Sequence, residues 1–205
     1  MPNSPADSRL LLASASPRRA QLLAQIGVPF CQRPVALVEC RHPSESARAY
    51  VLRLAREKAE AGRQWLSAGE ADWVLGADTL VLAEGGEVLE KPRDLADFHR
   101  MMALLCGSEH RVLTAVCLAD SGRSDCQLAE TRVCFRSLGR AQIDAYWRTG
   151  EPQDKAGGYG IQGRGAVLVE AINGSYSNVV GLPLETLAPM LEQAGIHYWQ
   201  GACGE

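Results

Sequence analysis

The chain has 205 residues, of which 46% are hydrophobic and 22% charged, and its formal net charge is −3. These values suit one domain at the upper end of ordinary size, or two small lobes that share a cleft, with a substantial apolar core. The slight acidity excludes a general basic field for nucleic acid, so an anionic ligand requires a few locally placed cations. Residues 1–8 are predicted to be a disordered tail and residues 9–200 a single domain.

The seven cysteines are scattered along the chain, at positions 31, 40, 106, 117, 126, 134 and 203. Their odd number and the lack of Cys-x-x-Cys spacing predict neither a disulfide framework nor a zinc ribbon. Scattered free thiols are typical of a reducing cytosol. No apolar run approaches the roughly 18 residues of a membrane span, and the N-terminus lacks the pattern of a signal peptide. We therefore expect a cytoplasmic protein.

Apolar periodicity and turn residues predict helices that alternate with strands along the whole chain. In chain order the predicted elements are a strand over 10–13, a helix over 17–26, an extended stretch over 35–38, a helix over 44–65, a strand over 73–77 with a continuation over 80–89, a helix over 95–106, strands over 112–118 and 128–135, a helix over 141–147, a strand over 166–172 and a helix over 184–194. Such interleaving indicates an α/β fold with a mixed sheet.

The loop from Ser14 to Arg19, which reads Ser-Ala-Ser-Pro-Arg-Arg, is the first candidate ligand site. It leads from a strand into a helix that begins at Pro17 with Ser16 as its cap. A helix N-terminus attracts phosphate through its unpaired N–H groups and its dipole, and the serines and arginines add donors and positive charge. The alternative is an ordinary capped surface helix with two solvated arginines. The chain contains no Walker loop.

Three charged residues form a second group of candidates. Lys58 lies within the apolar arc of its helix, so it must snorkel to solvent, pair with an acid or meet an anionic ligand. Asp78 ends an apolar strand, at the edge where open α/β sheets bind ligands, and Glu39 ends an earlier extended stretch in the same way. Two carboxylates that converge on one cleft can share Mg²⁺ or Mn²⁺. The alternative for Asp78 is an acid that caps a turn through Thr79.

The second half of the chain offers weaker candidates. Lys91 precedes a proline and can reach a phosphate, although a solvated lysine is the commoner arrangement. The glycine-rich run over 157–165 has the small size and flexibility to approach a ligand closely. Gln162 is the only amide side chain in this run, and an amide can read a base edge as both donor and acceptor. The four histidines show no metal-ligand spacing, and we expect all of them at the surface.

Several collinear segments, taken together, closely resemble the Maf family of nucleotide pyrophosphatases from Leu11 to about Leu191. These segments are LASASPRR, LAREKA, GADT, LEKPRD, DKAGGYGIQG and INGSYSNVVGLPL. The resemblance implies a fold related to that of the inosine triphosphate pyrophosphatases, with a central twisted mixed sheet flanked by helices and two lobes around a cleft. It also implies hydrolysis of a nucleoside triphosphate to the monophosphate and pyrophosphate, with Mg²⁺, Mn²⁺ or Co²⁺ as cofactor.

The same resemblance implies a role for individual residues. The residues that look like phosphate binders or phosphate-neutralising cations are Ser14, Arg19, Lys58 and Lys91. Asp78 resembles the general base, and Glu39 resembles its acidic partner at the metal. Where the family often has two acids together, this chain has Val38 and Glu39, so only the second acid is retained.

Substrate preference divides the family, and three residues follow one branch. Arg18, Thr79 and Gln162 resemble the branch that acts on dTTP and UTP, whereas the branch that acts on 7-methyl-GTP has tryptophan in place of the first arginine. The implied partner is therefore a nucleoside triphosphate, with no stable nucleic acid or membrane partner and with a homodimer left open. The alternatives are a pyrophosphatase for 7-methyl-GTP or a damaged pyrimidine nucleotide, and a regulatory protein that arrests septum formation by binding.

Overall fold

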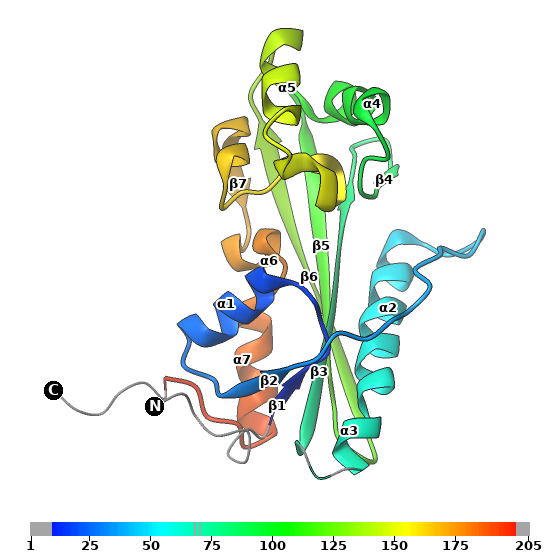
Figure 1. Ribbon diagram of the computed structural model, residues 1–205, viewed down its shortest axis with the longest axis vertical. Coiled ribbons are helices and arrows are strands. Elements are labelled where there is room, and N and C mark those ends of the chain that lie inside the picture. The colour runs from blue at the N-terminus through cyan, green and yellow to red at the C-terminus, as the bar shows by residue number, and fades with distance from the viewer. Residues whose placement is uncertain (1–9, 68, 70, 200–205) are drawn as a thin grey trace, which may run out of the picture. The chain divides into compact units, whose positions relative to one another are not determined.

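The computed structural model of the chain describes residues 10–67, 69 and 71–199 (Figure 1). The predicted disordered tail over residues 1–8 lies outside the described residues. The helices and strands are β1 (Leu10–Leu12), α1 (Pro17–Gln25), β2 (Phe30–Gln32), α2 (Ala47–Gly62), α3 (Gln64–Ser67), β3 (Trp73–Leu82), β4 (Val88–Leu89), α4 (Leu95–Leu105), β5 (Glu109–Ala119), β6 (Ser124–Phe135), α5 (Arg140–Trp147), the 3-10 segments η2 (Glu151–Asp154), η3 (Ala156–Gly158) and η4 (Arg164–Leu168), β7 (Val169–Asn173), α6 (Tyr176–Val180) and α7 (Leu184–Gln193).

The strands in the described part of the chain form one seven-stranded sheet in the order β2-β1-β3-β5-β6-β7, with β4 paired to β3. Strand β1 pairs parallel with β2 and with β3, whereas β3–β4 and β6–β7 are antiparallel. The predicted α/β class with a mixed sheet is therefore confirmed. Among residues 10–67, 69 and 71–199, no helix has the length and apolar character needed to cross a membrane.

The chain divides into two compact units. Among the described residues, unit 1 contains those up to Asp78, residues 115–128 and those from Gly181 onward, and unit 2 contains residues 79–114 and 129–180. The prediction of a single domain over residues 9–200 stays a prediction.

In unit 1, α1 and α7 cover one face of the sheet and α2 covers the other (Figure 1). Helix α2 approaches β3 closely at Gly76, because a Cβ at this position would lie only 2.2 Å from the Ala55 carbonyl oxygen and 2.5 Å from the Ala59 nitrogen. The buried face of α2 includes Lys58 among apolar side chains, as its position on the helix predicts. A glycine in β3 therefore sets how near Lys58 comes to the sheet.

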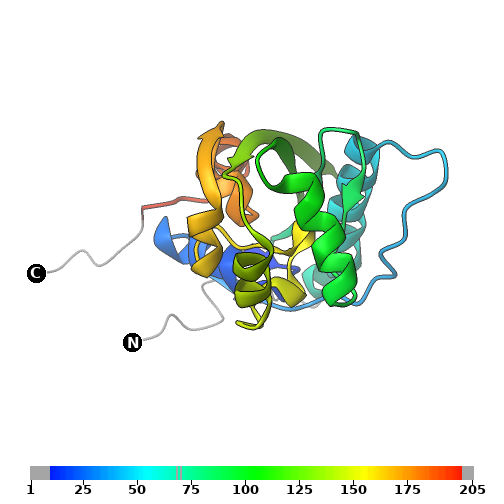
Figure 2. The same ribbon diagram turned by 90° about the horizontal axis from the view of Figure 1, so that it is seen from above.

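The core of unit 2 is rich in aromatic side chains. Helices α4 and α5 lie side by side in it (Figure 2), and the Phe98 ring lies 6.2 Å from that of Tyr146 and 5.1 Å from that of Trp147 between centroids. The buried members of this core are Val81, Ala83, Leu89, Phe98, Met101, Met102, Leu105, Val112, Val133, Phe135, Tyr146, Tyr159 and Leu168. Burial of this much apolar surface is the main source of stability for such a unit.

His110 lies in this aromatic core, so its predicted surface position is wrong. Its side chain is only 1% exposed, and its Nε2 lies 2.9 Å from the Tyr159 hydroxyl. The rings of Phe135 and Tyr159 both meet the imidazole edge to face. Burial lowers the pKa of His110 to about 4, because a charged imidazolium would lose its hydration there.

The extended stretch predicted over residues 35–38 is not a strand. The strand beside β1 is β2, at Phe30–Gln32, and its pairing ends with a hydrogen bond from the Arg33 N–H to the Leu12 carbonyl. Pro34 has no N–H to continue the ladder, so the chain leaves the sheet. Glu39 therefore lies in an irregular segment and does not end a strand.

Strand β3 continues beyond its predicted end. It runs without interruption from Trp73 to Leu82, so Asp78 lies within the strand. The neighbouring strand β1 ends earlier, since Leu12 pairs with Leu75. Asp78 is therefore three residues beyond the last β1 pair, where the side of β3 is no longer covered by β1.

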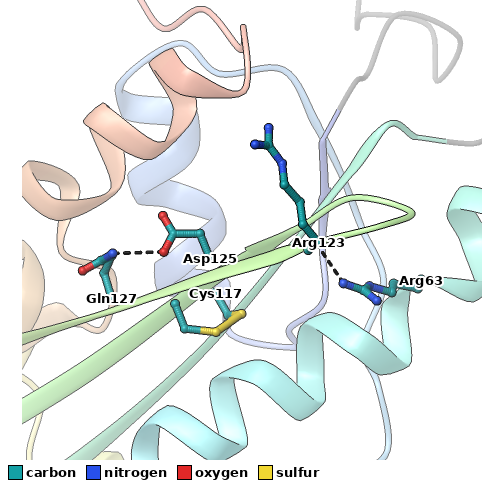
Figure 3. Close-up of a disulfide and its surroundings, with 6 residues drawn as sticks. Arg63, Cys117, Arg123, Asp125 and Gln127 are labelled. Carbon is teal, nitrogen blue, oxygen red and sulfur yellow. Dashed lines mark hydrogen bonds between the residues drawn. A yellow bond between two sulfur atoms is a disulfide. The ribbon is translucent and has the colours of Figure 1, made fainter.

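Cys117 and Cys126 form a disulfide across β5 and β6, so the prediction of free thiols is wrong for this pair (Figure 3). The Asp120 N–H donates to the Arg123 carbonyl at the turn, and counting back along both strands sets Cys117 opposite Cys126. Their Cα atoms lie 4.0 Å apart, so the two residues face each other across the strand pair. Register, and not Cys-x-x-Cys spacing, brings the two thiols together.

Candidate functional site

The loop that follows β1 is held by hydrogen bonds on both sides. The buried Ser14 Oγ accepts from Arg19 Nη1 at 3.0 Å and from the Ser16 N–H at 3.2 Å. Arg19 Nε donates to the Gly181 carbonyl at 2.9 Å, and Gln32 Nε2 donates to the Ser14 carbonyl at 2.8 Å. Arg19 is thus fixed beside Ser14 and is not a solvated surface arginine. Gln32 is part of this arrangement, and only the position of β2 reveals it.

The N-terminus of α1 presents positive charge at this loop. Ser16 occupies the N-cap position before Pro17, but within the described chain its side chain makes no capping hydrogen bond. The first-turn N–H groups therefore add to the positive end of the helix dipole. Burial lowers the pKa of Arg19, Asp78 raises it and the neighbouring Arg18 lowers it. Burial and Arg18 disfavour the charged form of this guanidinium, and a bound phosphate would stabilise it.

Lys58 lies between two carboxylates. Its Nζ is 2.6 Å from Glu39 Oε1 and 2.7 Å from Asp78 Oδ1. The side chains of Lys58 and Asp78 are both 11% exposed, whereas that of Glu39 is 47% exposed. The ammonium therefore neutralises a buried acid on one side and meets a solvent-accessible acid on the other. Of the outcomes open to a lysine on an apolar face, pairing with acids is the one found.

The environment of Asp78 makes it a better proton acceptor than an exposed aspartate. Burial raises the pKa of its carboxyl group, and the positive charges of Lys58 and Arg19 counteract this effect. A higher pKa means a stronger affinity of the carboxylate for a proton. General bases are most effective when their pKa lies near the working pH.

The irregular segment that carries Glu39 is tied to α2 by one arginine. Arg53 Nε and Nη2 each lie 2.8 Å from an oxygen of Glu45, and Nη2 also donates to the Cys40 carbonyl at 2.9 Å. Nη1 donates to Glu57 at 3.1 Å, so every nitrogen of the guanidinium is used. Hydrogen bonding to Arg53 lowers the pKa of Glu45 to about 2. The bond to Cys40 fixes the residue next to Glu39, a role that helix periodicity alone cannot indicate.

Thr79 follows Asp78 in β3 and faces the opposite side of the strand, because successive strand residues alternate. Its hydroxyl lies 3.0 Å from that of Thr114, which donates its proton to the Asn178 carbonyl at 2.9 Å. A hydroxyl has one proton. Thr79 must therefore be the donor to Thr114, so the direction of the Thr79 hydroxyl is fixed by a buried partner.

The remaining predicted residues belong to unit 2. Lys91 is exposed and follows β4, and Gln162 is exposed in the glycine-rich run between η3 and η4. Ser14, Arg18, Arg19, Glu39, Lys58 and Asp78 all belong to unit 1, and Thr79 begins unit 2.

Glu39 and Asp78 fit a divalent cation that completes its coordination with substrate and water. Their oxygens share one cation already, the Lys58 ammonium. Mg²⁺ in nucleotide enzymes is bound through one or two carboxylates together with substrate phosphates. No group of three or more His, Cys, Asp or Glu residues with metal-binding geometry occurs among the described residues. The donors present are two carboxylates, which suit a divalent cation that takes its remaining ligands from outside the protein.

The fold and these side chains together define an α/β protein with a strand-to-helix loop that carries fixed positive charge and, beside the end of β1, a cluster of two acids and a lysine. Residues 9–194 match the family described as Maf-like protein. The chain belongs to the Maf family.

Three relatives are named dTTP/UTP pyrophosphatase. That of Salmonella typhimurium is 54% identical over 176 residues, which cover 85% of this chain and 87% of the relative. That of Photobacterium profundum is 48% identical over 180 residues, with coverage of 86% and 91%, and that of Alcanivorax borkumensis is 48% identical over 192 residues, with coverage of 93% and 98%. These relatives are similar over nearly their whole length.

A solved structure, that of the Staphylococcus aureus Ham1 protein, shares the fold. It aligns with a TM-score of 0.51 at 11% sequence identity and covers 90% of this chain and 98% of its own. Ham1 proteins have the inosine triphosphate pyrophosphatase type of fold, so the expected relation of the fold to that type is confirmed, and at this identity the likeness concerns the fold alone.

Proposed function

We propose that the protein is a nucleoside triphosphate pyrophosphatase that hydrolyses dTTP and UTP to the monophosphate and pyrophosphate. The observation that carries the proposal is the pairing of the buried Asp78 with Lys58, in the same unit as the phosphate-binding loop at Ser14 and Arg19. An acid of raised pKa beside fixed cations suits the attack of water on a phosphoanhydride. Membership of the Maf family and the names of the close relatives supply the substrate class.

The cations bind and neutralise the triphosphate. Arg19, held by Ser14 and the Gly181 carbonyl, places a fixed positive charge at the loop, and the α1 N-terminus adds N–H donors for a phosphate. Lys58 offers a third source of positive charge. Phosphoryl transfer demands mainly positioning and charge stabilisation, so these groups supply most of the catalysis.

Asp78 acts as the general base. Oδ1 is bound to Lys58, and we assign Oδ2 to the attacking water. The water oxygen forms a bond to the α-phosphorus, its proton passes to Asp78, and the bond between the α-phosphorus and the bridging oxygen breaks. Pyrophosphate leaves with the electron pair of that bond, and the water supplies the new oxygen of the monophosphate.

Glu39 and Asp78 would hold the divalent cation, Mg²⁺, Mn²⁺ or Co²⁺. When bound, the metal neutralises the triphosphate and the departing pyrophosphate. Glu39 is the more exposed of the two acids, so it can turn from Lys58 toward an arriving ion without loss of buried packing.

Arg18, Thr79 and Gln162 account for the preference for a pyrimidine base. An amide can donate to O4 and accept from N3–H of uracil or thymine, an edge that the two bases share. Thr79 donates its proton to Thr114, so the direction of its hydroxyl is set by a buried partner. Lys91 is assigned to the phosphates.

Pyrophosphate release from dTTP, UTP, CTP, 7-methyl-GTP and ITP tests the proposal. We expect dTTP and UTP to be preferred, and Asp78→Asn to lower kcat by about 100-fold or more, which is typical of a lost general base. The matched control is Asp125→Asn, an exposed aspartate in the same unit. Near-normal turnover by Asp78→Asn would exclude the base assignment, and a preference for a purine would exclude the pyrimidine branch.

A further inference from the structure

A single carboxylate in unit 2 holds the glycine-rich run. Glu151 Oε1 accepts from the Tyr146 hydroxyl at 2.8 Å and from the Gly165 N–H at 2.9 Å. Its Oε2 accepts from the Arg164 N–H at 2.8 Å. Both oxygens are therefore bound, two of the three donors being backbone groups of the run itself. Charged acceptors make stronger hydrogen bonds to backbone N–H groups than neutral ones do.

The Tyr146 hydroxyl binds the backbone on the other side of Gln162. It accepts from the Gly160 N–H at 3.2 Å while it donates to Glu151. The backbone is thus held two residues before Gln162, at Gly160, and two residues after it, at Arg164. Gln162 itself is exposed at the turn between these fixed points.

Two glycines exist in the run because the Glu151–Tyr146 pair lies against its backbone. A Cβ on Gly163 would meet Glu151 Oε2 at 2.3 Å, and one on Gly165 would meet the Tyr146 hydroxyl at 2.5 Å. Such distances are far below van der Waals contact, so no other residue fits without displacing the pair. The glycines serve close packing here, whereas flexibility is the property that the sequence alone suggests.

The carboxylate stays charged over the neutral pH range. Partial burial raises the pKa of Glu151, but the N–H groups of Gly165 and Arg164, the Tyr146 hydroxyl and the positive charge of Lys155 together outweigh that effect and leave it below its usual value. An acceptor of constant charge keeps the three hydrogen bonds intact whatever the pH near neutrality.

We propose that Glu151, acting with Tyr146, is a positioning residue for base selection: it presets the backbone around Gln162 so that the amide meets the O4 and N3–H edge of uracil or thymine. The inference rests on the proposed pyrimidine pyrophosphatase function. Gln162 is exposed on a turn, and a turn whose backbone is not held would carry the amide through many positions, which would weaken binding. Glu151 removes that cost before the substrate arrives.

Glu151→Gln in the full chain is the first test. Its amide oxygen can still accept from Tyr146 and Gly165, but its NH₂ group faces the Arg164 N–H, so one hydrogen bond is replaced by two opposed donors. We expect kcat/KM for UTP to fall about 10-fold, chiefly through KM, which corresponds to loss of one ordinary hydrogen bond. Hydrolysis of methyl triphosphate, which has no base, is expected to stay unchanged, and the preference for UTP over 7-methyl-GTP to fall. Glu170→Gln, an exposed acid on β7, is the matched control.

Tyr146→Phe tests the same idea independently and keeps the ring in its apolar core. It removes the bonds to Glu151 and Gly160 and should shift base preference in the same direction, again with methyl triphosphate unaffected. It decides the matter if Glu151→Gln fails to fold.

Equal losses on UTP and methyl triphosphate, or an unchanged UTP preference in both variants, would overturn the inference. A different result would contradict the proposed function itself: no release of pyrophosphate from dTTP or UTP by the wild-type protein.

Discussion

The Lys58 ammonium and the Asp78 carboxylate form a buried ion pair, with Nζ 2.7 Å from Oδ1. The pair joins the C-terminal half of α2 to the middle of β3, at a level of the sheet where β1 has already ended. A buried carboxylate that loses its cationic partner is costly, so Lys58 stabilises the charged form of Asp78. This coupling makes the acidity of Asp78 depend on Lys58, which leads to the first prediction.

Lys58→Met should move the acidic limb of the pH–rate profile to higher pH. Asp78 must be deprotonated to act as a base, so activity is lost as pH falls through its pKa. Burial raises that pKa and Lys58 counteracts the rise, so removing the ammonium leaves a higher pKa. The measurement is kcat/KM for UTP against pH, with Arg56→Met, on the exposed face of α2, as control. An acidic limb that stayed in place in Lys58→Met would show that Asp78 does not set it.

Gly76→Ala should destabilise the protein and weaken catalysis together. The added methyl would lie 2.2 Å from the Ala55 carbonyl oxygen and 2.5 Å from the Ala59 nitrogen, both helix backbone atoms that cannot move independently. Overpacking of this kind costs about 3 kcal/mol, and moving α2 outward would also separate Lys58 from Asp78. Urea unfolding measures the first effect and kcat the second.

Gly85→Ala is the control for this substitution, since a Cβ at Gly85 meets nothing within 4 Å. Unchanged stability of Gly76→Ala would mean that α2 does not lie as close to β3 as described.

Much of the site could be predicted from sequence because its residues lie within strong local patterns. Lys58 interrupts an apolar helical stripe, and Asp78 interrupts an apolar strand, so each is conspicuous where it stands. The loop from Ser14 to Arg19 lies between a strand and a helix whose starts and ends are well marked. Periodicity predicts positions of this kind, because one face of each element must be buried.

The residues that escaped prediction act through contacts between distant segments. Arg53 lies on the flank of α2 and gains its role only from Glu45 and the Cys40 carbonyl. Glu151 is one acid among many until the backbone of Gly165 folds onto it. The stretch over 35–38 misled because its apolar residues suggested a strand, while Pro34 had already ended the pairing.

Thr114→Val should relax the choice of base. Thr114 is fully buried and accepts the Thr79 proton, so its loss removes the partner that sets the direction of that hydroxyl. The preference for UTP over 7-methyl-GTP should fall, while Thr114→Ser, which retains the hydroxyl, keeps it. Valine also leaves the Asn178 carbonyl without its donor, at a cost of about 1–3 kcal/mol in unfolding free energy. Identical selectivity in the valine and serine variants would contradict the assignment.

His110 predicts a loss of stability in mild acid. In the unfolded chain a histidine takes up a proton near its ordinary pKa of 6.5, whereas in the folded protein burial lowers the pKa of His110 to about 4. As pH falls from about 6.5 toward about 4, the unfolded state binds a proton that the folded state does not bind, so the free energy of unfolding decreases. The full loss approaches about 3 kcal/mol and is absent above the unfolded pKa.

His110→Gln removes this titration and should flatten the decline of the unfolding free energy between about pH 7 and about pH 4.5. Glutamine still offers a polar partner to the Tyr159 hydroxyl, so the unfolding free energies of the wild type and the variant can be compared at neutral pH. The control is His197→Gln, an exposed histidine, which should decline as the wild type does. Urea unfolding at both pH values gives the two slopes. Parallel declines in the wild type and His110→Gln would show that His110 is not held neutral in the folded state.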